Sequence, residues 1–454
     1  MSDLEKIKNV NKIITDKFPK LNNQYIIESS IESTYSEVFF PINEFKQDSY
    51  IEFRVPKSTS VYTALSSIYL KFHLNVFKQG SLNGRWGEKK ALAVGDHLDL
   101  IQNTAYSIIK LLTLDINNVQ IQNIDNYALN AYIKTLINFP IDQYSKLAHL
   151  IHLEDYNKII EKYQESDFEN LDDANAKRLL DIRQHGVYIY APVLLDISKI
   201  KSLLIDGLDF IFRFTLHDAA FIVNTAQNNT DISGTAGKRY LPELENVSLH
   251  MSRFQPSKNA HNALQSSLLP RNNQVPTLEY PFISQINKQY YIPHGRDTFV
   301  IENPWGDKIP DRIFLAFQKT EAFNTRDHTL NGLFLAHLNI KNFYITINSN
   351  TIFNINCDFT NKSVSEVYHE LLAAIGDDSH LITYNKFLDG ATLFGFNLIY
   401  KDSSANISPS IKGTLRIVLT FSEPVSTSSM LYLLGDHLSI LTVNHNRELV
   451  LNTS

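Results

Sequence analysis

Two histidines in the first half of the chain are the best candidates for metal chemistry in this sequence. His149 and His152 stand three residues apart, and Glu154 and Asp155 follow them. On a helix this spacing places both imidazoles on one face beside carboxylates, which are zinc ligands. The H-E-x-x-H order and an evident third ligand are missing. We therefore favour an interfacial or capping role for the pair and predict no metal site.

A glycine-containing stretch at residues 234–239, GTAGKR, superficially matches a phosphate-binding loop. The glycine that should precede Gly237 by five residues is absent, and Arg239 replaces the hydroxyl that binds magnesium. We predict no nucleotide site here, and no cofactor for the chain as a whole.

Residues that could form a nucleophilic site are present but poorly arranged. Asp436, His437 and Ser439 are nearly adjacent, and in a strand neighbouring side chains point to opposite faces. Cys357 is the one cysteine, which excludes an internal disulfide, and its apolar setting in INCDF predicts a buried side chain. A cysteine nucleophile paired with a distant histidine has no support beyond composition. We predict no catalytic residues.

Basic residues beside aromatic ones could stack on single-stranded nucleic acid. The candidates are Arg253 with Phe254, and Lys288 with Tyr290 and Tyr291. Tyrosines in such runs more often belong to the face of a sheet. The net charge of −6 argues against a surface built throughout to bind polyphosphate.

The bulk composition is that of a soluble globular protein of two or three domains. The chain has 454 residues, of which 43% are hydrophobic and 20% are charged. No stretch reaches the roughly 18 apolar residues of a membrane span, and the polar N-terminus lacks a secretory signal. We expect a protein that is made inside the cell and has no membrane span.

Apolar alternation predicts a chain made mainly of strands. Helices are predicted at residues 1–20 as an amphipathic arm, at 125–139, and at 363–375, where Ser363 and Glu366 have the spacing of a capping box. Residues 21–48 resemble a loop. The charged segment 141–185 is predicted to be a solvated helical insertion, and 227–242 to be a linker or long loop. Strands are predicted at 51–55, 66–77, 108–121, 186–195, 207–217, 220–226, 245–254, 312–317, 338–347, 391–400, 413–421 and 430–444.

The two halves show a weak, ordered repeat. Tyr188, Tyr190 and Gly207 match Phe394, Phe396 and Gly413 at a constant offset of 206, and LDINNVQIQN (114–123) matches ITINSNTIFN (345–354). A helix follows that second match in each half, and the insertion at 141–185 occurs only in the first. Two copies of an antiparallel sandwich would explain the length and the strand-rich pattern.

The segment at residues 303–354 carries a family resemblance. Pro310 and Arg312 lie in IPDRI, Ala322-Phe323-Asn324 follow in a polar loop, and the strand with ITIN comes next. This pattern resembles the double jelly-roll major capsid proteins of Polinton (Maverick) elements and adintovirus-like DNA viruses, and the similarity extends loosely from about residue 45 to 451. Gly332 stands where that family usually has a proline, so we expect the largest local difference there.

The resemblance implies a mainly β fold of two tandem antiparallel jelly-roll sandwiches, with short helices between strands. We predict an N-terminal arm at 1–44, a first jelly roll at 45–242 and a second at 243–454. The implied function is a major capsid protein that forms a homotrimeric, pseudo-hexagonal capsomer of an icosahedral virion. The implied partners are the protein itself, a penton or minor capsid protein, and genomic DNA through weak inner-face contacts.

Two alternatives remain open at this point. A β-sandwich module that binds glycans or single-stranded nucleic acid predicts a monomer or dimer with a ligand groove. A hydrolase that uses His149 and His152 predicts stoichiometric bound metal.

Overall fold

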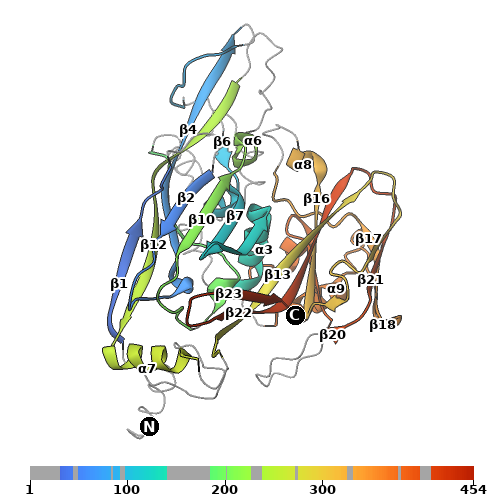
Figure 1. Ribbon diagram of the computed structural model, residues 1–454. Coiled ribbons are helices and arrows are strands. Elements are labelled where there is room, and N and C mark those ends of the chain that lie inside the picture. The colour runs from blue at the N-terminus through green and yellow to red at the C-terminus, as the bar shows by residue number, and fades with distance from the viewer. Residues whose placement is uncertain are drawn as a thin grey trace, which may run out of the picture.

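The computed structural model shows a mainly β protein whose strands run from residue 31 to residue 453 (Figure 1). It describes residues 31–43, 50–82, 85–92, 98–140, 185–200, 202–225, 238–270, 275–324, 331–376, 380–398 and 411–453. The predicted helix at 1–20, most of the insertion at 141–185 and most of the linker at 227–242 lie outside these residues.

The first half forms two facing antiparallel sheets. One has its main strands in the order β1-β12-β4-β9, and the other in the order β2-β10-β7-β8. Their bounds are β1 Ile31–Phe39, β2 Tyr50–Val55, β4 Tyr69–Leu82, β7 Ile109–Ile116, β8 Val119–Asp125, β9 Val187–Pro192, β10 Phe210–Leu216 and β12 Lys238–Pro256. Short strands complete this half: β3 Tyr62–Thr63, β5 Arg85–Trp86, β6 Leu98–Leu100 and β11 Val223–Thr225.

The second half repeats this order in two more sheets, β13-β22-β16-β19 and β14-β21-β17-β18. The bounds are β13 Leu278–Ile292, β14 Thr298–Glu302, β16 Arg312–Lys319, β17 Ile340–Ile347, β18 Asn350–Asn356, β19 Leu393–Asn397, β21 Leu415–Phe421 and β22 Ser429–Val443. Three short strands are added: β15 Lys308–Ile309, β20 Ile411–Lys412 and β23 Leu449–Thr453. This strand order, with each sheet joining strands far apart in sequence, is that of a jelly roll. The duplication predicted from the sequence is therefore present in the topology.

Matching turns show how closely the halves agree. The hairpin β7–β8 turns at Asn117 and Asn118, and the hairpin β17–β18 turns at Asn348 and Ser349. All four residues have positive φ angles, which two-residue hairpin turns require and asparagine tolerates well. In each half the turn asparagine accepts a hydrogen bond from the backbone just before the next inner strand, Asp209 N at 2.8 Å and Thr414 N at 2.9 Å.

The register of the repeat differs by one residue from the predicted offset. Tyr188 and Tyr190 are exposed on β9, whereas Phe394 and Phe396 are fully buried on β19. Because alternate side chains point to opposite faces, these residues cannot be equivalent. The buried Ile189 matches Phe394 instead, at an offset of 205, which also relates the first residues of β10 and β21.

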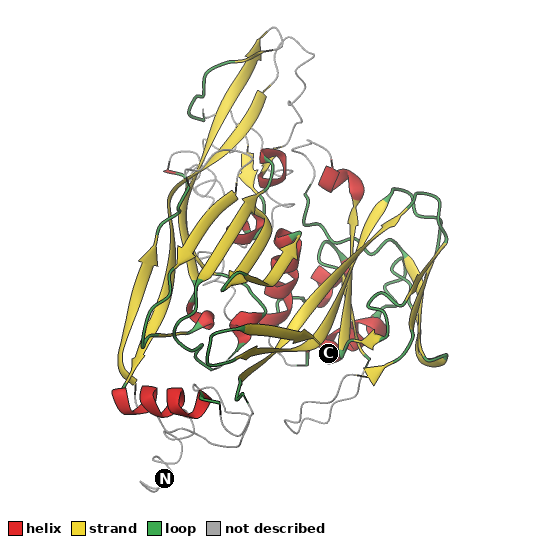
Figure 2. Ribbon diagram, viewed as in Figure 1, coloured by secondary structure: helices red, strands yellow, loops and turns green. Residues whose placement is uncertain are grey.

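Figure 2 shows that most of the helices lie between or beside the sheets. Their bounds are α2 Thr104–Ser107, α3 Tyr127–Asn138, α6 Ala219–Ile222, α7 Lys258–Leu268, α8 Thr320–Asn324, α9 Ser365–Ile375 and α10 Tyr384–Leu388, with 3₁₀ turns η1 Leu65–Ser67 and η4 Ile197–Lys199. The two predicted helices at 125–139 and 363–375 correspond to α3 and α9.

The two jelly rolls lie side by side. From left to right, Figure 1 shows β1 and β12, then β2, β10 and β7, then helix α3, then β13 and β16, and finally β17, β21 and β18. Apolar side chains from alternate strand positions fill each sandwich, among them Phe53, Phe212, Phe343 and Phe394, which are fully buried.

Four local predictions are corrected by the structure. Residues 31–39 lie in the segment predicted to be a loop, yet they form β1, which pairs with β12 along its whole length. Ala322-Phe323-Asn324 lie in the short helix α8 rather than in a loop. The capping box at Ser363 does not form, because α9 begins after Val364 and no side chain caps it. Strand β12 crosses the boundary predicted at residue 242 and pairs with β1 and β4, so the chain changes rolls between β12 and β13.

Candidate assembly surfaces

Helix α3 forms the junction between the two jelly rolls. It lies on the β7 side of the first roll and faces the second, and nearly all its residues are buried. Lys134 on this helix forms an ion pair with Asp196, with Nζ and Oδ1 2.7 Å apart and both side chains almost fully buried. The other carboxylate oxygen accepts hydrogen bonds from Gln122 Nε2 at 3.1 Å and from the backbone N of Gln285 at 3.0 Å. Since Gln285 belongs to β13, one buried carboxylate joins the two rolls.

Arg312, a residue of the family motif, lies at the same junction. Its guanidinium donates to Asp436 across the strand pair and to the carbonyl of Ala374, 2.8 Å away, at the end of α9. Asp436 also accepts from Gln285 Nε2 at 3.1 Å. Burial lowers the pKa of nearby Lys199, and this residue lies within the field of the same charges. Arg312 therefore ties strand, helix and junction together.

The other motif residues have simpler places. Pro310 is buried just before β16. Ala322 is half-buried in α8, and Phe323 and Asn324 complete that helix, although the structure describes only their backbone. Gly332 packs against Phe221 of the first roll: a Cβ here would lie 2.2 Å from the Phe221 ring. This contact leaves no room for the proline that the resembled family carries.

The candidate metal and phosphate sites are not assembled among the described residues. His149, His152, Glu154 and Asp155 lie outside them, as do the glycines of the stretch at 234–239. Within the part of the chain that the structure describes, no group of three or more His, Cys, Asp and Glu side chains could hold a metal ion.

The nucleophile candidates are separated or blocked. Asp436 faces the junction, whereas His437 lies on the opposite face of β22, with its ring centroid 5.6 Å from that of Trp305. Ser439 Oγ lies 3.0 Å from Thr453 Oγ1. Burial raises the pKa of Cys357 to about 12, and its thiol donates to the Ile340 carbonyl. A thiol with this pKa is almost entirely protonated at neutral pH, so it is a poor nucleophile.

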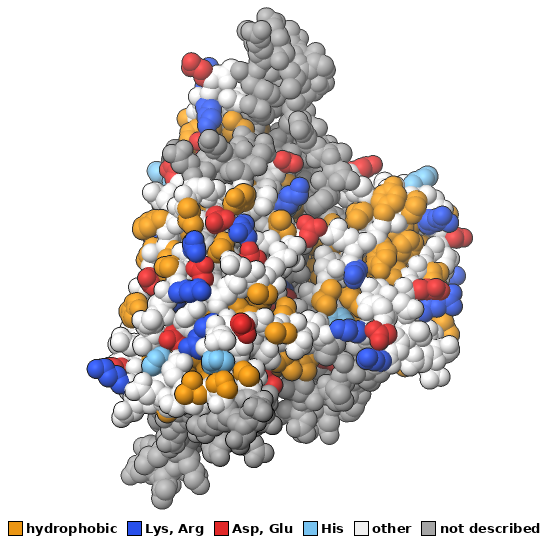
Figure 3. Space-filling view, in the orientation of Figure 1, with side chains coloured by type: hydrophobic (Ala, Val, Ile, Leu, Met, Phe, Trp, Pro, Cys, Tyr) orange, Lys and Arg blue, Asp and Glu red, His pale blue; other side chains and the backbone are white. Residues whose placement is uncertain are grey.

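The candidate stacking residues for nucleic acid are mostly engaged in packing. Arg253 is buried, and its guanidinium donates to Glu37 at 2.9 Å and to Thr63. Tyr290 is half-buried against Phe299, and Tyr291 is exposed but donates to Ser428. Figure 3 shows positive and negative side chains interspersed over the visible face, without a broad basic area.

The structure does present an exposed aromatic surface, on the outer face of the first sheet. Tyr188 and Tyr190 on β9 are 68% and 41% exposed. Tyr188 stacks on His73 with ring centroids 4.0 Å apart, and Tyr190 stacks on Tyr69 at 5.0 Å. Tyr190 also meets the edge of His250 at 5.4 Å, and burial lowers the pKa of His250. We call these five residues the tyrosine face.

Sequence reasoning missed both the junction and the tyrosine face. Lys134 interrupts the apolar pattern of α3, and Asp196 directly follows the apolar run APVLL. An isolated charge beside buried positions is a usable signal for a buried ion pair. The alternation in VYIYAP places Tyr188 and Tyr190 on one face of the strand, and the pairing of β9 with β4 shows that this face points outward.

No protein-family model matches the chain. An uncharacterized protein of Caenorhabditis elegans is 22% identical over 368 residues, which cover 78% of this chain and 81% of that protein.

Solved viral structures are similar over nearly the whole chain. A chain of the Sputnik virophage has a TM-score of 0.60 at 13% identity, covering 95% of this chain and 90% of its own length. The faustovirus major capsid protein gives 0.57 at 8% identity, covering 92% of each chain. The mavirus major capsid protein gives 0.54 at 11% identity, covering 96% and 92%. The fold is the viral double jelly roll. None of the helices in the described residues is long and apolar enough to cross a membrane.

Proposed function

We propose that this chain is a major capsid protein. The observation that carries the proposal is the extent of the structural likeness, since the chain aligns with the mavirus and faustovirus major capsid proteins over more than nine tenths of its length. The buried polar contacts at the junction support the proposal as well, because a rigid two-roll unit is what a shell can be built from. The proposed site of action is the virion.

The proposed assembly is a homotrimer with a pseudo-hexagonal outline that covers an icosahedral shell. Six jelly rolls of similar size would surround one axis, two from each copy. The sequence resemblance supports placing the chain in the Polinton and adintovirus lineage. We further propose a penton or minor capsid protein as a partner at the vertices, and weak contacts between the inner face and genomic DNA.

The mass of the purified protein in solution tests this proposal. We expect a trimer by light scattering, and hexagonal arrays or shells by negative-stain microscopy at high concentration. A protein that remains monomeric at high concentration would contradict the proposed capsomer.

The second candidate is a glycan-binding module. The tyrosine face favours it, because exposed aromatic rings stack on sugar rings. This candidate predicts a monomer or dimer whose tyrosine fluorescence changes when oligosaccharides are added, with Tyr188→Ala abolishing the change.

A further inference from the structure

The second jelly roll has an open pocket among the loops at one of its ends. The volume of the pocket is about 260 Å³. Three loops form it, at residues 334–339 before β17, 389–390 after α10, and 423–427 between β21 and β22, and Lys319 at the end of β16 completes it. Figure 1 shows α8, which directly follows Lys319, at the opposite end of the molecule from α7. The pocket therefore lies at the strand ends rather than on the face of a sheet.

Backbone hydrogen bonds fix the loops that form the pocket. Leu335 N donates to the Gly390 carbonyl at 2.9 Å, which joins the first two loops. Val425 N donates to the Arg296 carbonyl at 2.9 Å, and Gly295 N donates back to the Val425 carbonyl at 2.8 Å, which anchors the third loop. The pocket is therefore preformed, as small-molecule sites usually are.

The backbone in one wall of the pocket is strained. Leu338 and Asn339 both have a φ angle of +49°, in the left-handed region that leucine rarely adopts. The His337 ring supports this turn, because its Nδ1 accepts a hydrogen bond from Asn339 N at 3.0 Å. Such strain persists only where the surrounding structure enforces it, and it is concentrated at ligand sites.

The His337 ring also supplies a neutral donor to this wall. Since Nδ1 accepts a hydrogen bond, the ring proton lies on Nε2. Burial lowers the pKa of His337, and the Asp389 carboxylate opposes this shift only in part. The ring stacks on Phe359 with centroids 4.4 Å apart, which fixes its orientation. At neutral pH, His337 is therefore an uncharged hydrogen-bond donor.

One part of the lining is apolar and includes an aromatic ring. The half-buried Phe334 lies beside the buried Leu335 and Val425. Gly390 packs against the Phe334 ring, where a Cβ would come within 3.4 Å of it, and the φ angle of +88° at this position suits glycine. This part of the pocket can cover the C–H face of a small ring.

The polar part of the lining has one negative charge in excess. Asp389 and Glu423 supply two carboxylates, Lys319 supplies one ammonium group, and Ser426 and Thr427 add hydroxyls. Within the described part of the chain, none of the three charged groups forms an ion pair with another side chain. Carboxylates are strong acceptors for hydroxyl groups, and the excess negative charge repels an anionic ligand.

We propose that this pocket binds a single neutral hexose ring, the terminal sugar of a glycan. A sugar ring has a C–H face and carries hydroxyl groups around its edge, so it matches both parts of the lining. Pockets for drug-sized molecules span roughly 300–1,000 Å³, so a space of about 260 Å³ suits one ring. The site is separate from the tyrosine face and does not depend on the proposed assembly. On a capsid it would attach the shell to glycosylated surfaces.

Binding of sugars to the purified full chain tests the proposal. The probes are the methyl glycosides of glucose, galactose, mannose and N-acetylglucosamine, with glucuronic acid as an anionic counterpart, and saturation-transfer NMR titrations measure their binding. We expect at least one neutral glycoside to bind, and glucuronic acid to bind at least ~10-fold more weakly because of the excess carboxylate. Failure of every neutral glycoside to bind, or equal binding of the acid, would overturn the proposal.

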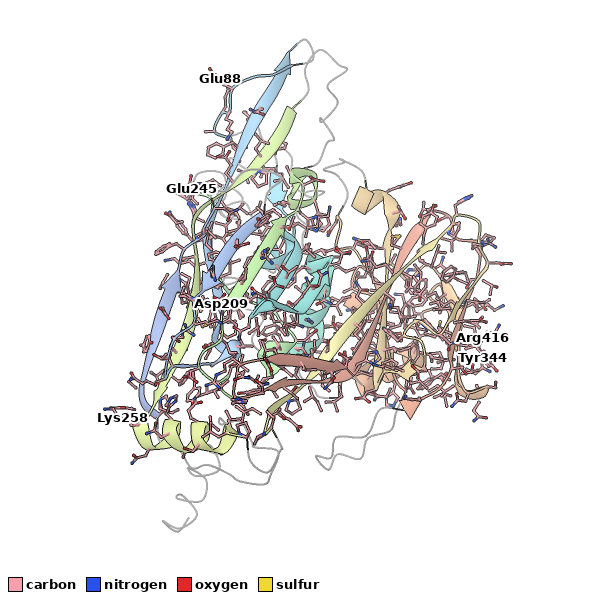
Figure 4. All side chains as sticks on the ribbon, viewed as in Figure 1. Glu88, Asp209, Glu245, Lys258, Tyr344 and Arg416 are labelled. Carbon is pink, nitrogen blue, oxygen red and sulfur yellow. The ribbon has the colours of Figure 1, made fainter. Side chains whose placement is uncertain are left out.

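Variants of the pocket locate the bound sugar. Ser426→Trp places a large ring in the pocket, and Asp389→Asn/Glu423→Gln removes both carboxylates. We expect either change to weaken binding at least ~10-fold. The matched controls are Ser365→Trp, at the exposed start of α9, and Glu88→Gln, which Figure 4 places beside β4 on the first roll. Both controls should bind the sugar as the unaltered chain does.

The outcomes keep this inference apart from the proposed function. Thermal unfolding and light scattering show whether each variant keeps its fold and its assembly state. A trimer that binds no neutral glycoside would overturn the sugar pocket and leave the capsomer intact, whereas a monomer that binds through the pocket would do the reverse. Binding that survives both pocket variants, or that Tyr188→Ala alone abolishes, would place the sugar elsewhere and overturn the inference.

Discussion

The two jelly rolls share strand order and turn geometry but differ in what covers their first sheet. In the second roll, α9 covers β19, so closely that a Cβ on Gly395 would lie 3.0 Å from Leu371 and from Phe314. In the first roll the equivalent residue is Tyr190, which projects into solvent. The strand order is therefore determined by packing inside each sandwich, whereas the residues on the outer faces can differ between the two rolls.

The helices that follow the β8 and β18 strands explain the difference. Helix α9 returns over its own roll, with many contacts to β19, whereas α3 packs near β7 and becomes the junction. The helix at this position of the repeat thus covers a sheet in the second roll, whereas in the first roll it lies at the junction between the two rolls. Four predictions, each based on one or two substitutions, test how far the two rolls differ.

The largest effect is expected at the junction, where the second roll has no equivalent of Lys134. Replacing Lys134 by Met leaves the carboxylate of Asp196 buried without its cation. We expect a loss of about 3–5 kcal/mol in the free energy of unfolding, measured by urea denaturation. The control Lys134→Met/Asp196→Leu should recover part of the loss. An unchanged midpoint in the single variant would show that the junction does not depend on this pair.

The next effect concerns stability in acid, which we expect to depend on a histidine that only the first roll has. His217 follows β10, and Ser422 occupies the equivalent place after β21. Burial lowers the pKa of His217 from its ordinary value of 6.5 to about 3. The unfolded chain then binds a proton that the folded chain does not, so this stability is complete above pH 6.5 and is lost as the pH falls toward 3. We expect the wild type to lose roughly 3 kcal/mol more between pH 7 and pH 4 than His217→Gln. Equal losses in urea titrations at both pH values would contradict this.

A smaller effect is expected when valine is introduced at two equivalent outer positions, Gly395 in the second roll and Tyr190 in the first. Gly395→Val overpacks the space under α9 and should cost about 1–3 kcal/mol. Tyr190→Val removes an exposed ring and should change the unfolding free energy of the isolated subunit by no more than about 0.5 kcal/mol. Thermal unfolding of both at low protein concentration makes the comparison. Similar costs would mean that the Tyr190 face is covered within the subunit.

The smallest difference is expected between the paired turn asparagines. Asn117→Ala and Asn348→Ala each lose an acceptor for a backbone N–H at a residue with a positive φ angle. Asn117 also donates to the Arg447 carbonyl at 2.9 Å, which links the first roll to the C-terminal tail. We expect Asn117→Ala to cost about 1 kcal/mol more than Asn348→Ala in chemical denaturation. The matching glycine variants, which tolerate the backbone angle, control for strain.

Much of the fold could be predicted because strands and helices leave local patterns. The alternation in FIFRFTL and LRIVLTF gives β10 and β21. The single strand predicted at 108–121 was wrong, because the chain turns at Asn117 and Asn118 and forms the two strands β7 and β8. The offset between the rolls was wrong by one residue because the aromatic residues lie on the outer face of β9 but on the inner face of β19. Similarity of residue type could not reveal which ring points inward. The edge strand β1 was missed because its side chains are mostly exposed, so its pattern is polar.

The assembly surfaces could be predicted only in part. The family resemblance selected Arg312, which contacts Asp436 and the end of α9, but it could not indicate that Asp436 and Gln285 complete the cluster. Along the chain, Asp436 lies 124 residues from Arg312 and 151 residues from Gln285. The exposed face around Tyr190 depends on where α3 goes, and α3 is placed by long-range packing that has no local signature.

The burial of α3 has a consequence for synthesis on the ribosome. Domains fold largely in the order in which they emerge, and the first roll is complete before β13 has been made. Until then the side of α3 whose Asn130 and Leu136 will contact Gln285 and Leu381 faces water. A nascent first roll therefore presents a hydrophobic helix with a buried-type lysine to chaperones and to other nascent chains. Only the arrival of its own second roll removes that hazard.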